Sequence, residues 1–166
     1  MTDAELPRID IDLADEAETA ALAGRIAGVC GVGDVIALGG DLGAGKTVFA
    51  RAFIRAYLGR PEEVPSPTFT LLQIYGDEGS TPVHHFDLYR LNDASETFEL
   101  GFDEALADGI ALIEWPDRLG ALLPSDRLDL ELRQGPSPDS RRARLTGHGF
   151  WRARLIESLG EAAIHG

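Results

Sequence analysis

One short segment, GDLGAGKT at residues 40–47, has the residue types and the spacing of a phosphate-binding loop, or P-loop. Its glycines let backbone N–H groups curl around phosphate oxygens without a Cβ in the way. Lys46 would reach the β- and γ-phosphates of a nucleotide, and the Thr47 hydroxyl would face Mg²⁺. The pattern therefore predicts that ATP and Mg²⁺ bind here, through Asp41, Leu42, Gly43, Ala44, Gly45, Lys46, Thr47 and Val48.

The lysine of this segment is unusual within the chain. The sequence has 15 basic residues, of which Lys46 is the only lysine, so every other cation is an arginine. An ammonium group is a compact point charge on a thin stem, whereas a planar guanidinium is wider and favours bidentate partners. The presence of the single lysine inside the glycine-rich segment therefore fits a backbone loop that encloses phosphates, where a guanidinium would be too wide.

Two acidic residues follow apolar runs, at positions where a P-loop protein needs a second group for Mg²⁺ or water. Asp87 comes after VHHF, and Glu114 comes after IALI. A solvated acid at the end of a strand is the alternative for each. We expect Asp87 and Glu114 to act with Lys46 in catalysis, and both acids to join Thr47 at the metal. The pattern leaves open which acid binds Mg²⁺ and which positions water.

Three further features are less specific. Thr68 lies in the loop after the P-loop helix, where a hydroxyl can sense the γ-phosphate, although a simple proline turn fits equally well. Trp115 follows Glu114 directly and fits either core packing or a surface beside the nucleotide. His84 and His85 are adjacent, so on a strand they face opposite sides and cannot form a metal pair. We interpret both histidines as structural.

The periodicity of apolar residues predicts the elements that would position these groups. Leu22, Ile26 and Val29 have helical spacing, and residues 34–40 form a continuous apolar run typical of a buried strand. The remaining patterns predict helices over 48–59, 93–109 and 150–160, strands over 69–75, 82–89 and 110–116, and a hairpin of 127–133 with 141–147. This order indicates an α/β fold, with a mixed, mostly parallel-cored sheet flanked by helices and a C-terminal β-hairpin.

Composition limits the classes of function. The chain of 166 residues is 44% hydrophobic, which suits a single P-loop domain over residues 1–166. A net charge of −13 disfavours direct binding to nucleic acid, because such binding depends on basic residues. The sequence lacks an apolar run of the roughly 20 residues that span a bilayer, and its first residues lack a signal-peptide core. We therefore expect a cytoplasmic protein without membrane contact.

Four blocks together resemble one known family. GDLGAGKT, SPTFTLLQIY, HFDLYRL and IEWPDRL, in this order and spacing, are similar to the TsaE family of small bacterial ATPases, which acts in tRNA threonylcarbamoyladenosine synthesis. The resemblance extends from the first helix to the IEWP block, and more weakly through the hairpin.

The resemblance implies an ATPase that binds ATP with Mg²⁺ and hydrolyses it slowly. It implies two protein partners, TsaB and TsaD, which transfer a threonylcarbamoyl group to adenosine 37 of tRNA, so that contact with tRNA is indirect. It also implies that Thr68 belongs to a switch-like loop, that Asp87 and Glu114 are the acids of the site, and that Trp115 lies near the nucleotide.

Two alternatives remain at this stage. A small-molecule kinase would need an acceptor pocket and commonly an arginine-bearing lid, but the segment 95–109 is acidic. A nucleotide-gated interaction module would use hydrolysis only to reset its conformation, and sequence cannot separate it from the family reading. The only basic cluster indicates either a solvated hairpin face or a docking patch for an acidic partner; its members are Arg141, Arg142, Arg144, Arg152 and Arg154.

Overall fold

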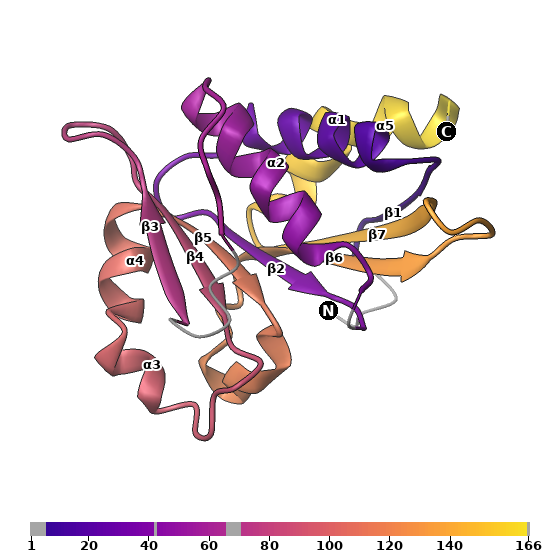
Figure 1. Cartoon of the computed structure of the whole chain (residues 1–166). Coiled ribbons are helices and arrows are strands. Elements are labelled where there is room, and N and C mark those ends of the chain that lie inside the picture. Colours follow the sequence, from indigo (N-terminus) through magenta and orange to yellow (C-terminus); the bar gives the residue numbers. More distant parts are fainter. Residues whose placement is uncertain (1–5, 42, 66–70, 166) are drawn as a thin grey trace.

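A computed structural model of the chain describes residues 6–41, 43–65 and 71–165, with side chains up to residue 159. Seven strands form one sheet in the order β1-β7-β6-β2-β5-β4-β3 (Figure 1). The strands are β1 (Arg8–Leu13), β2 (Val35–Gly39), β3 (Leu72–Tyr75), β4 (Val83–Asp87), β5 (Ile110–Glu114), β6 (Arg127–Gln134) and β7 (Arg141–His148). The α/β fold expected from the sequence is thus confirmed.

The centre of the sheet is parallel and its edges are antiparallel. β6, β2, β5 and β4 run in the same direction, whereas β1 and β7 on one side and β3 on the other pair antiparallel. β2 lies between β5 and β6. The chain after β2 first builds the strands on one side of it, β3 to β5, and then those on the other side, β6 and β7, so the direction of strand addition reverses at β2. In open α/β sheets such a reversal, outside the carboxyl ends of the strands, is where ligands bind.

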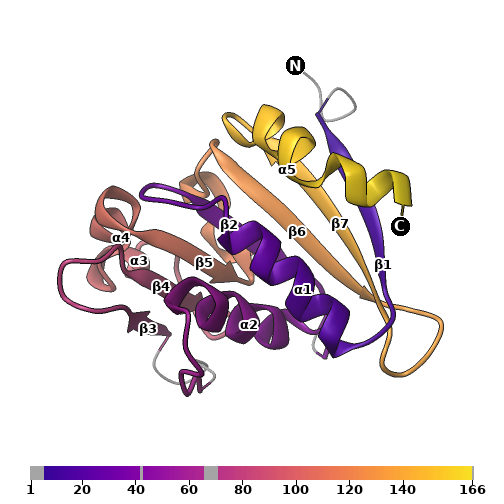
Figure 2. The same cartoon turned by 90° about the horizontal axis from the view of Figure 1, so that it is seen from above.

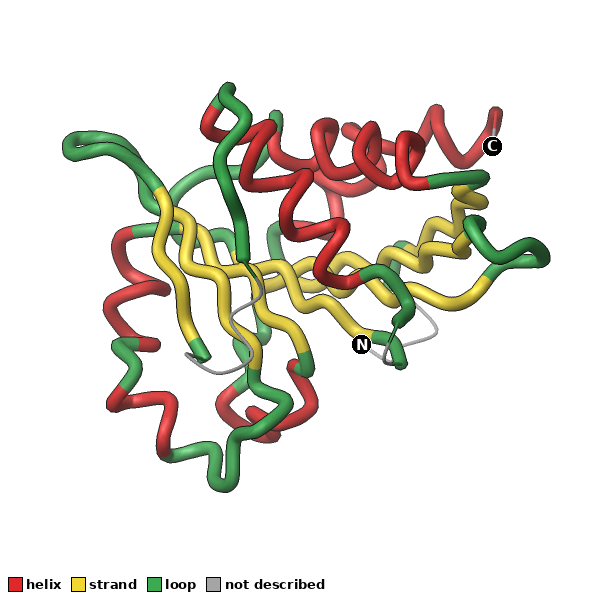
Figure 3. Tube along the Cα trace, viewed as in Figure 1, coloured by secondary structure: helices red, strands yellow, loops and turns green. Residues whose placement is uncertain are grey.

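Helices cover the two faces of the sheet unequally. α1 (Glu16–Ala27), α2 (Lys46–Leu58) and α5 (Trp151–His165) lie across one face (Figure 2). α3 (Glu96–Glu99), α4 (Phe102–Asp108) and the 3₁₀-helix η2 (Pro116–Leu122) lie on the opposite side, toward the β3–β4–β5 end (Figure 3). None of the described helices is both long enough and apolar enough to cross a membrane.

The larger core lies between the sheet and the first group of helices. Phe49 and Phe53 of α2 are fully buried there, with Ile26 of α1 and Leu155 of α5. Burying each aromatic ring contributes about 1.5–3 kcal/mol. This packing fixes α2 against the sheet, and thereby fixes the loop that precedes it.

Local sequence features explain several boundaries, and they correct two expectations. α1 begins at the N-cap Asp15, whose side chain accepts from the Glu18 N–H, but it ends at Ala27, so Val29 lies beyond the helix and is 38% exposed. The helix expected over 93–109 is in fact two short helices. Gly101, with a φ of 77°, separates α3 from α4, because this left-handed conformation interrupts a helix.

Candidate functional site

The glycine-rich loop connects the carboxyl end of β2 to the amino end of α2, as the sequence predicts. Gly40, Gly43 and Gly45 have φ values of 133°, 80° and 103°, a region that side chains with a Cβ rarely adopt. Gly40 also lies close to β6, because a Cβ there would be 2.4 Å from the Leu132 carbonyl oxygen. Conformation therefore favours glycine at all three positions, and at Gly40 the lack of space for a Cβ requires it as well.

Lys46 is the first residue of α2, and its side chain is 5% exposed. Its Nζ donates to the carbonyl oxygens of Gly40 and Asp41, the latter at 3.4 Å, and lies 3.5 Å from the centre of the Trp115 ring. Burial lowers the pKa of Lys46 below 10.5, while the negative charge of nearby acids, Glu114 foremost, acts in the opposite direction. The ammonium is thus partly desolvated at the start of a helix.

The two strand-end acids meet as the sequence predicts. Asp87 and Glu114 are register partners at the ends of the parallel strands β4 and β5, and they are 5% and 2% exposed. The Thr47 hydroxyl donates to Glu114 Oε1 at 3.2 Å. Asp87 Oδ1 accepts from the Tyr89 N–H at 3.1 Å. Lysine, hydroxyl and both acids therefore converge at one edge of the sheet.

His85 is part of this network, although sequence reasoning treated it as only structural. Its Nε2 lies 2.6 Å from Glu114 Oε2, and the residue is fully buried. The two oxygens of Glu114 are thus bridged to His85 and to Thr47. The period-2 pattern of VHHFD could have located His85, since positions 85 and 87 share a face of β4. His84 points to the other side and lies 3.4 Å from Asp108, as two adjacent strand residues must diverge.

Trp115 lies beside the loop and is held in a restricted backbone conformation. Its φ is 61°, and it precedes η2, whose first residue is Pro116. Its ring packs against Tyr89 at 4.9 Å between centres, as well as against the Lys46 ammonium. Both interpretations left open by the sequence therefore apply, because Trp115 lies beside the loop and is also packed, partly buried, against the smaller core cluster. Leu42 and Thr68 lie outside the described residues.

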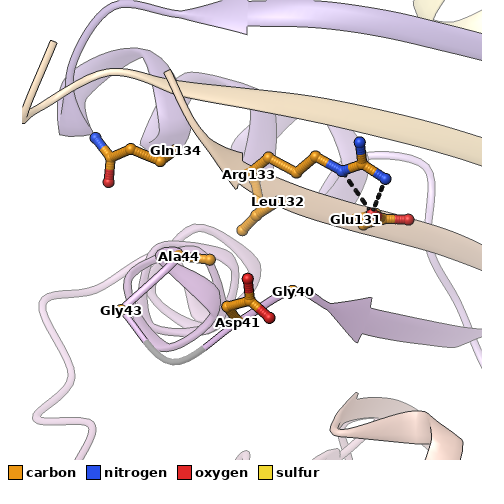
Figure 4. Close-up of a pocket in the computed structure, with 8 residues that line it drawn as sticks. All are labelled: Gly40, Asp41, Gly43, Ala44, Glu131, Leu132, Arg133 and Gln134. Carbon is orange, nitrogen blue, oxygen red and sulfur yellow. Dashed lines mark hydrogen bonds and ion pairs between the residues drawn. The ribbon is translucent and has the colours of Figure 1, made fainter. Parts of the chain in front are cut away.

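Asp41 is exposed at the start of the loop and Val48 is half-buried in the first turn of α2. Beside the loop, a cavity of about 620 Å³ is bounded by residues 40, 41, 43 and 44 and by 131–134 of β6 (Figure 4). Its ionic groups include Glu131 and Arg133, which pair with each other at 2.7 Å. Neither Lys46 nor the two strand-end acids line this cavity. The cavity therefore lies next to the cluster of Lys46, Thr47 and the two acids and does not contain that cluster.

The site can be tested for its fit to Mg²⁺ and a nucleotide. The amino end of α2 and the loop N–H groups favour an anion, and Lys46 adds a positive charge there. Mg²⁺ keeps several waters and takes only one or two carboxylates besides phosphate oxygens. Within the described part of the chain, no three His, Cys, Asp or Glu side chains gather as a complete metal cage. A hydroxyl and two carboxylates beside an anion site thus suit Mg²⁺ held jointly with phosphate.

Comparison with known proteins decides the family. The sequence model described as threonylcarbamoyl adenosine biosynthesis protein TsaE matches residues 13–143. The chain belongs to the TsaE family. The TsaE protein of Rickettsia felis is 42% identical over 120 residues, which cover 72% of this chain and 70% of that protein. The TsaE protein of Bacillus subtilis is 40% identical over 143 residues, covering 86% and 87%.

The crystal structure of Bacillus subtilis YdiB has the same fold. It superposes with a TM-score of 0.75 at 30% sequence identity, over 95% of this chain and 97% of that one. The comparisons therefore confirm the TsaE resemblance and the α/β architecture.

Proposed function

We propose that this chain is a Mg²⁺-dependent P-loop ATPase that acts in the formation of threonylcarbamoyladenosine in tRNA. The related proteins carry the name tRNA threonylcarbamoyladenosine biosynthesis protein TsaE, which supports the pathway. We also propose that the chain assists TsaB and TsaD, and that tRNA is contacted by the complex. The net charge of −13 supports this division, since an acidic protein binds RNA poorly by itself.

One observation carries the ATPase assignment. The buried Lys46 ammonium, the Thr47 hydroxyl and the Asp87 and Glu114 carboxylates lie together at the end of a buried parallel strand pair. Catalysis of phosphoryl transfer is mostly positioning and charge stabilisation, for which these groups suffice. A solvated acid at a strand end would not be 2% exposed and bonded to the hydroxyl of a P-loop, as Glu114 is.

Each residue then has a distinct role. The loop N–H groups and Lys46 would hold the phosphates, and Lys46 would balance the charge on the transferred phosphoryl group. Thr47 and Glu114, which already contact each other, would hold Mg²⁺, whose bound form neutralises phosphate charge. Asp87, the register neighbour of Glu114, would orient the attacking water. His85 keeps the Glu114 carboxylate in place through its bond to Oε2.

The test is ATP turnover by the purified chain, measured as phosphate release with and without TsaB and TsaD from the same organism. We expect weak turnover alone and strong stimulation by the two partners, with no need for a small acceptor molecule. Lys46→Ala should abolish the stimulated rate, whereas Arg142→Gln, a surface charge change, should not. ADP formation that depends on a small-molecule acceptor would favour the kinase alternative and contradict the proposal.

A further inference from the structure

Arg141, the first residue of β7, hydrogen-bonds through its guanidinium to the backbone of the glycine-rich loop. Its Nε donates to the Ala44 carbonyl oxygen at 3.0 Å, and Nη2 donates to the Gly43 carbonyl oxygen at 3.2 Å. Nη1 donates to the carbonyl oxygens of Pro138 and Ser140 at 2.8 and 2.7 Å. One guanidinium therefore joins the loop between β6 and β7 to the loop that precedes α2.

The neighbouring arginines on β7 behave differently. Arg142 and Arg144 form ion pairs with Asp12 and Asp10 of β1, at 3.4 and 2.9 Å. Among the described residues, no carboxylate lies within ion-pair distance of Arg141. All four of its hydrogen bonds above go to backbone carbonyls. The arginines of the basic cluster on β7 therefore differ in their contacts. Arg142 and Arg144 pair with β1, and of these three strand residues only Arg141 contacts the P-loop.

The geometry of the peptide bond gives these contacts a consequence. Because the trans peptide is planar, a C=O and the N–H of the next residue point in opposite directions. Holding the Gly43 carbonyl therefore also orients the Ala44 N–H, which donates to the Asp41 carbonyl oxygen at 3.1 Å and so closes the turn of the loop. Holding the Ala44 carbonyl likewise directs the Gly45 N–H away from Arg141. One side chain thus orients two successive N–H groups, of which that of Ala44 closes the turn and that of Gly45 would face a phosphate.

The loop has particular need of such an anchor. Gly43 and Gly45, with left-handed φ values, have more backbone freedom to lose than other residues. A Cβ placed on Gly45 would lie 3.6 Å from Arg141 Nε, so the guanidinium packs directly on this part of the loop. A loop ordered before binding saves the free energy that ordering would otherwise subtract from affinity.

We propose that Arg141 is a positioning residue that holds the turn of the P-loop and its Gly45 N–H in the conformation that binds nucleotide phosphates. The inference rests on the proposed function, because it concerns the same loop. It makes the β6–β7 hairpin part of the nucleotide site, without direct contact between Arg141 and the phosphates.

The experiment compares Arg141→Gln, Arg141→Lys and the matched control Arg142→Gln, which removes the adjacent charge of the same strand. Amide hydrogen exchange of a peptide that covers residues 43–47 is measured first, on nucleotide-free protein. The melting temperature without nucleotide, the dissociation constant for Mg²⁺·ATP, and KM and kcat with TsaB and TsaD are then measured.

We expect faster exchange of the loop peptide and about tenfold or greater weakening of Mg²⁺·ATP binding in Arg141→Gln. KM should rise with little change in kcat, because the loop holds the phosphates in both ground and transition states. Arg141→Lys should be almost as impaired, since an ammonium cannot span the four carbonyls that the guanidinium fork reaches. Arg142→Gln should stay within about twofold of the wild type, as an exposed ion pair contributes little.

Wild-type exchange and affinity in Arg141→Gln would overturn the inference, as would full rescue by lysine, which would indicate a charge effect alone. A fall in nucleotide-free melting temperature with unchanged loop exchange and affinity would also overturn it, because Arg141 would then be merely structural. Failure of the wild type to bind Mg²⁺·ATP would instead refute the proposed function, while the exchange measurement still decides whether Arg141 orders the loop.

Discussion

Removing the charge of Lys46 should eliminate nucleotide binding while the fold is retained. Lys46→Met keeps most of the buried stem, and it removes an ammonium whose pKa is lowered by burial, so the unliganded protein should lose little stability. The cost is the loss of the donor to the Gly40 and Asp41 carbonyls and of the contact with the Trp115 ring. These effects oppose each other, and we expect a net change of about 1 kcal/mol or less.

The effect on nucleotide-induced stabilisation should be much larger. At 100 times its dissociation constant, Mg²⁺·ATP stabilises the wild type by about 2.7 kcal/mol. With an unfolding entropy of about 2.1 cal/mol/K per residue, a chain of 166 residues then melts about 8 °C higher. If the variant binds about 100-fold more weakly, the same nucleotide concentration gives about 0.4 kcal/mol, or about 1 °C.

The assay is thermal unfolding with and without Mg²⁺·ATP, at one nucleotide concentration, for the wild type, Lys46→Met and the surface control Arg142→Gln. The control should show the wild-type rise of about 8 °C, since Arg142 lies on the exposed face of β7 and pairs only with Asp12 among the described residues. A rise in Lys46→Met equal to that of the wild type would refute the assignment of Lys46 to the phosphates.

Four further outcomes are expected. Asp87→Asn and Glu114→Gln should each lower partner-stimulated turnover at least about 100-fold, while the dissociation constant for ATP changes far less. The double variant should lose much less turnover than the two single losses combined would predict, because both acids serve one assembly. Affinity for ATP, measured by titration calorimetry from neutral to alkaline pH, should fall as pH rises through the pKa of Lys46, because only the ammonium form attracts phosphate and burial places that pKa below 10.5. Gly40→Ala should cost about 2 kcal/mol or more in a urea titration, because its Cβ would meet the Leu132 carbonyl at 2.4 Å. Asp15→Ala should cost about 1 kcal/mol in the same titration, through loss of the N-cap of α1.

Much of the site could be predicted because its chemistry is encoded in short, contiguous patterns. The spacing of Gly40, Lys46 and Thr47 predicts a loop between a buried strand and a helix, and the structure has that loop. Asp87 and Glu114 end two apolar runs, and parallel pairing of those runs places the acids side by side. Periodicity and strand-end position are local signals, so they can be recognised in the sequence without knowledge of the fold.

What could not be predicted depends on contacts between distant segments. β1 was missed although its RIDIDL alternation is itself a strand signal, and only its antiparallel pairing with β7 depends on a distant segment. His85 and Glu114, which the strand register brings together, are 29 residues apart in the sequence. Arg141 and Ala44, whose carbonyl it contacts, are 97 residues apart. The break at Gly101 depends on a left-handed φ that a glycine permits but does not require.

The central claim is that Lys46 contacts the phosphates of a bound nucleotide, and the single lysine of the chain allows it to be measured directly. Protein containing ¹³C- and ¹⁵N-labelled lysine gives the NMR signals of one side chain, Lys46. Without nucleotide, its pKa should lie below 10.5, because the buried ammonium is partly desolvated. With Mg²⁺ and a non-hydrolysable ATP analogue the pKa should rise, because phosphate oxygens favour the charged form. An unchanged chemical shift and an unchanged pKa at saturating nucleotide would contradict the account.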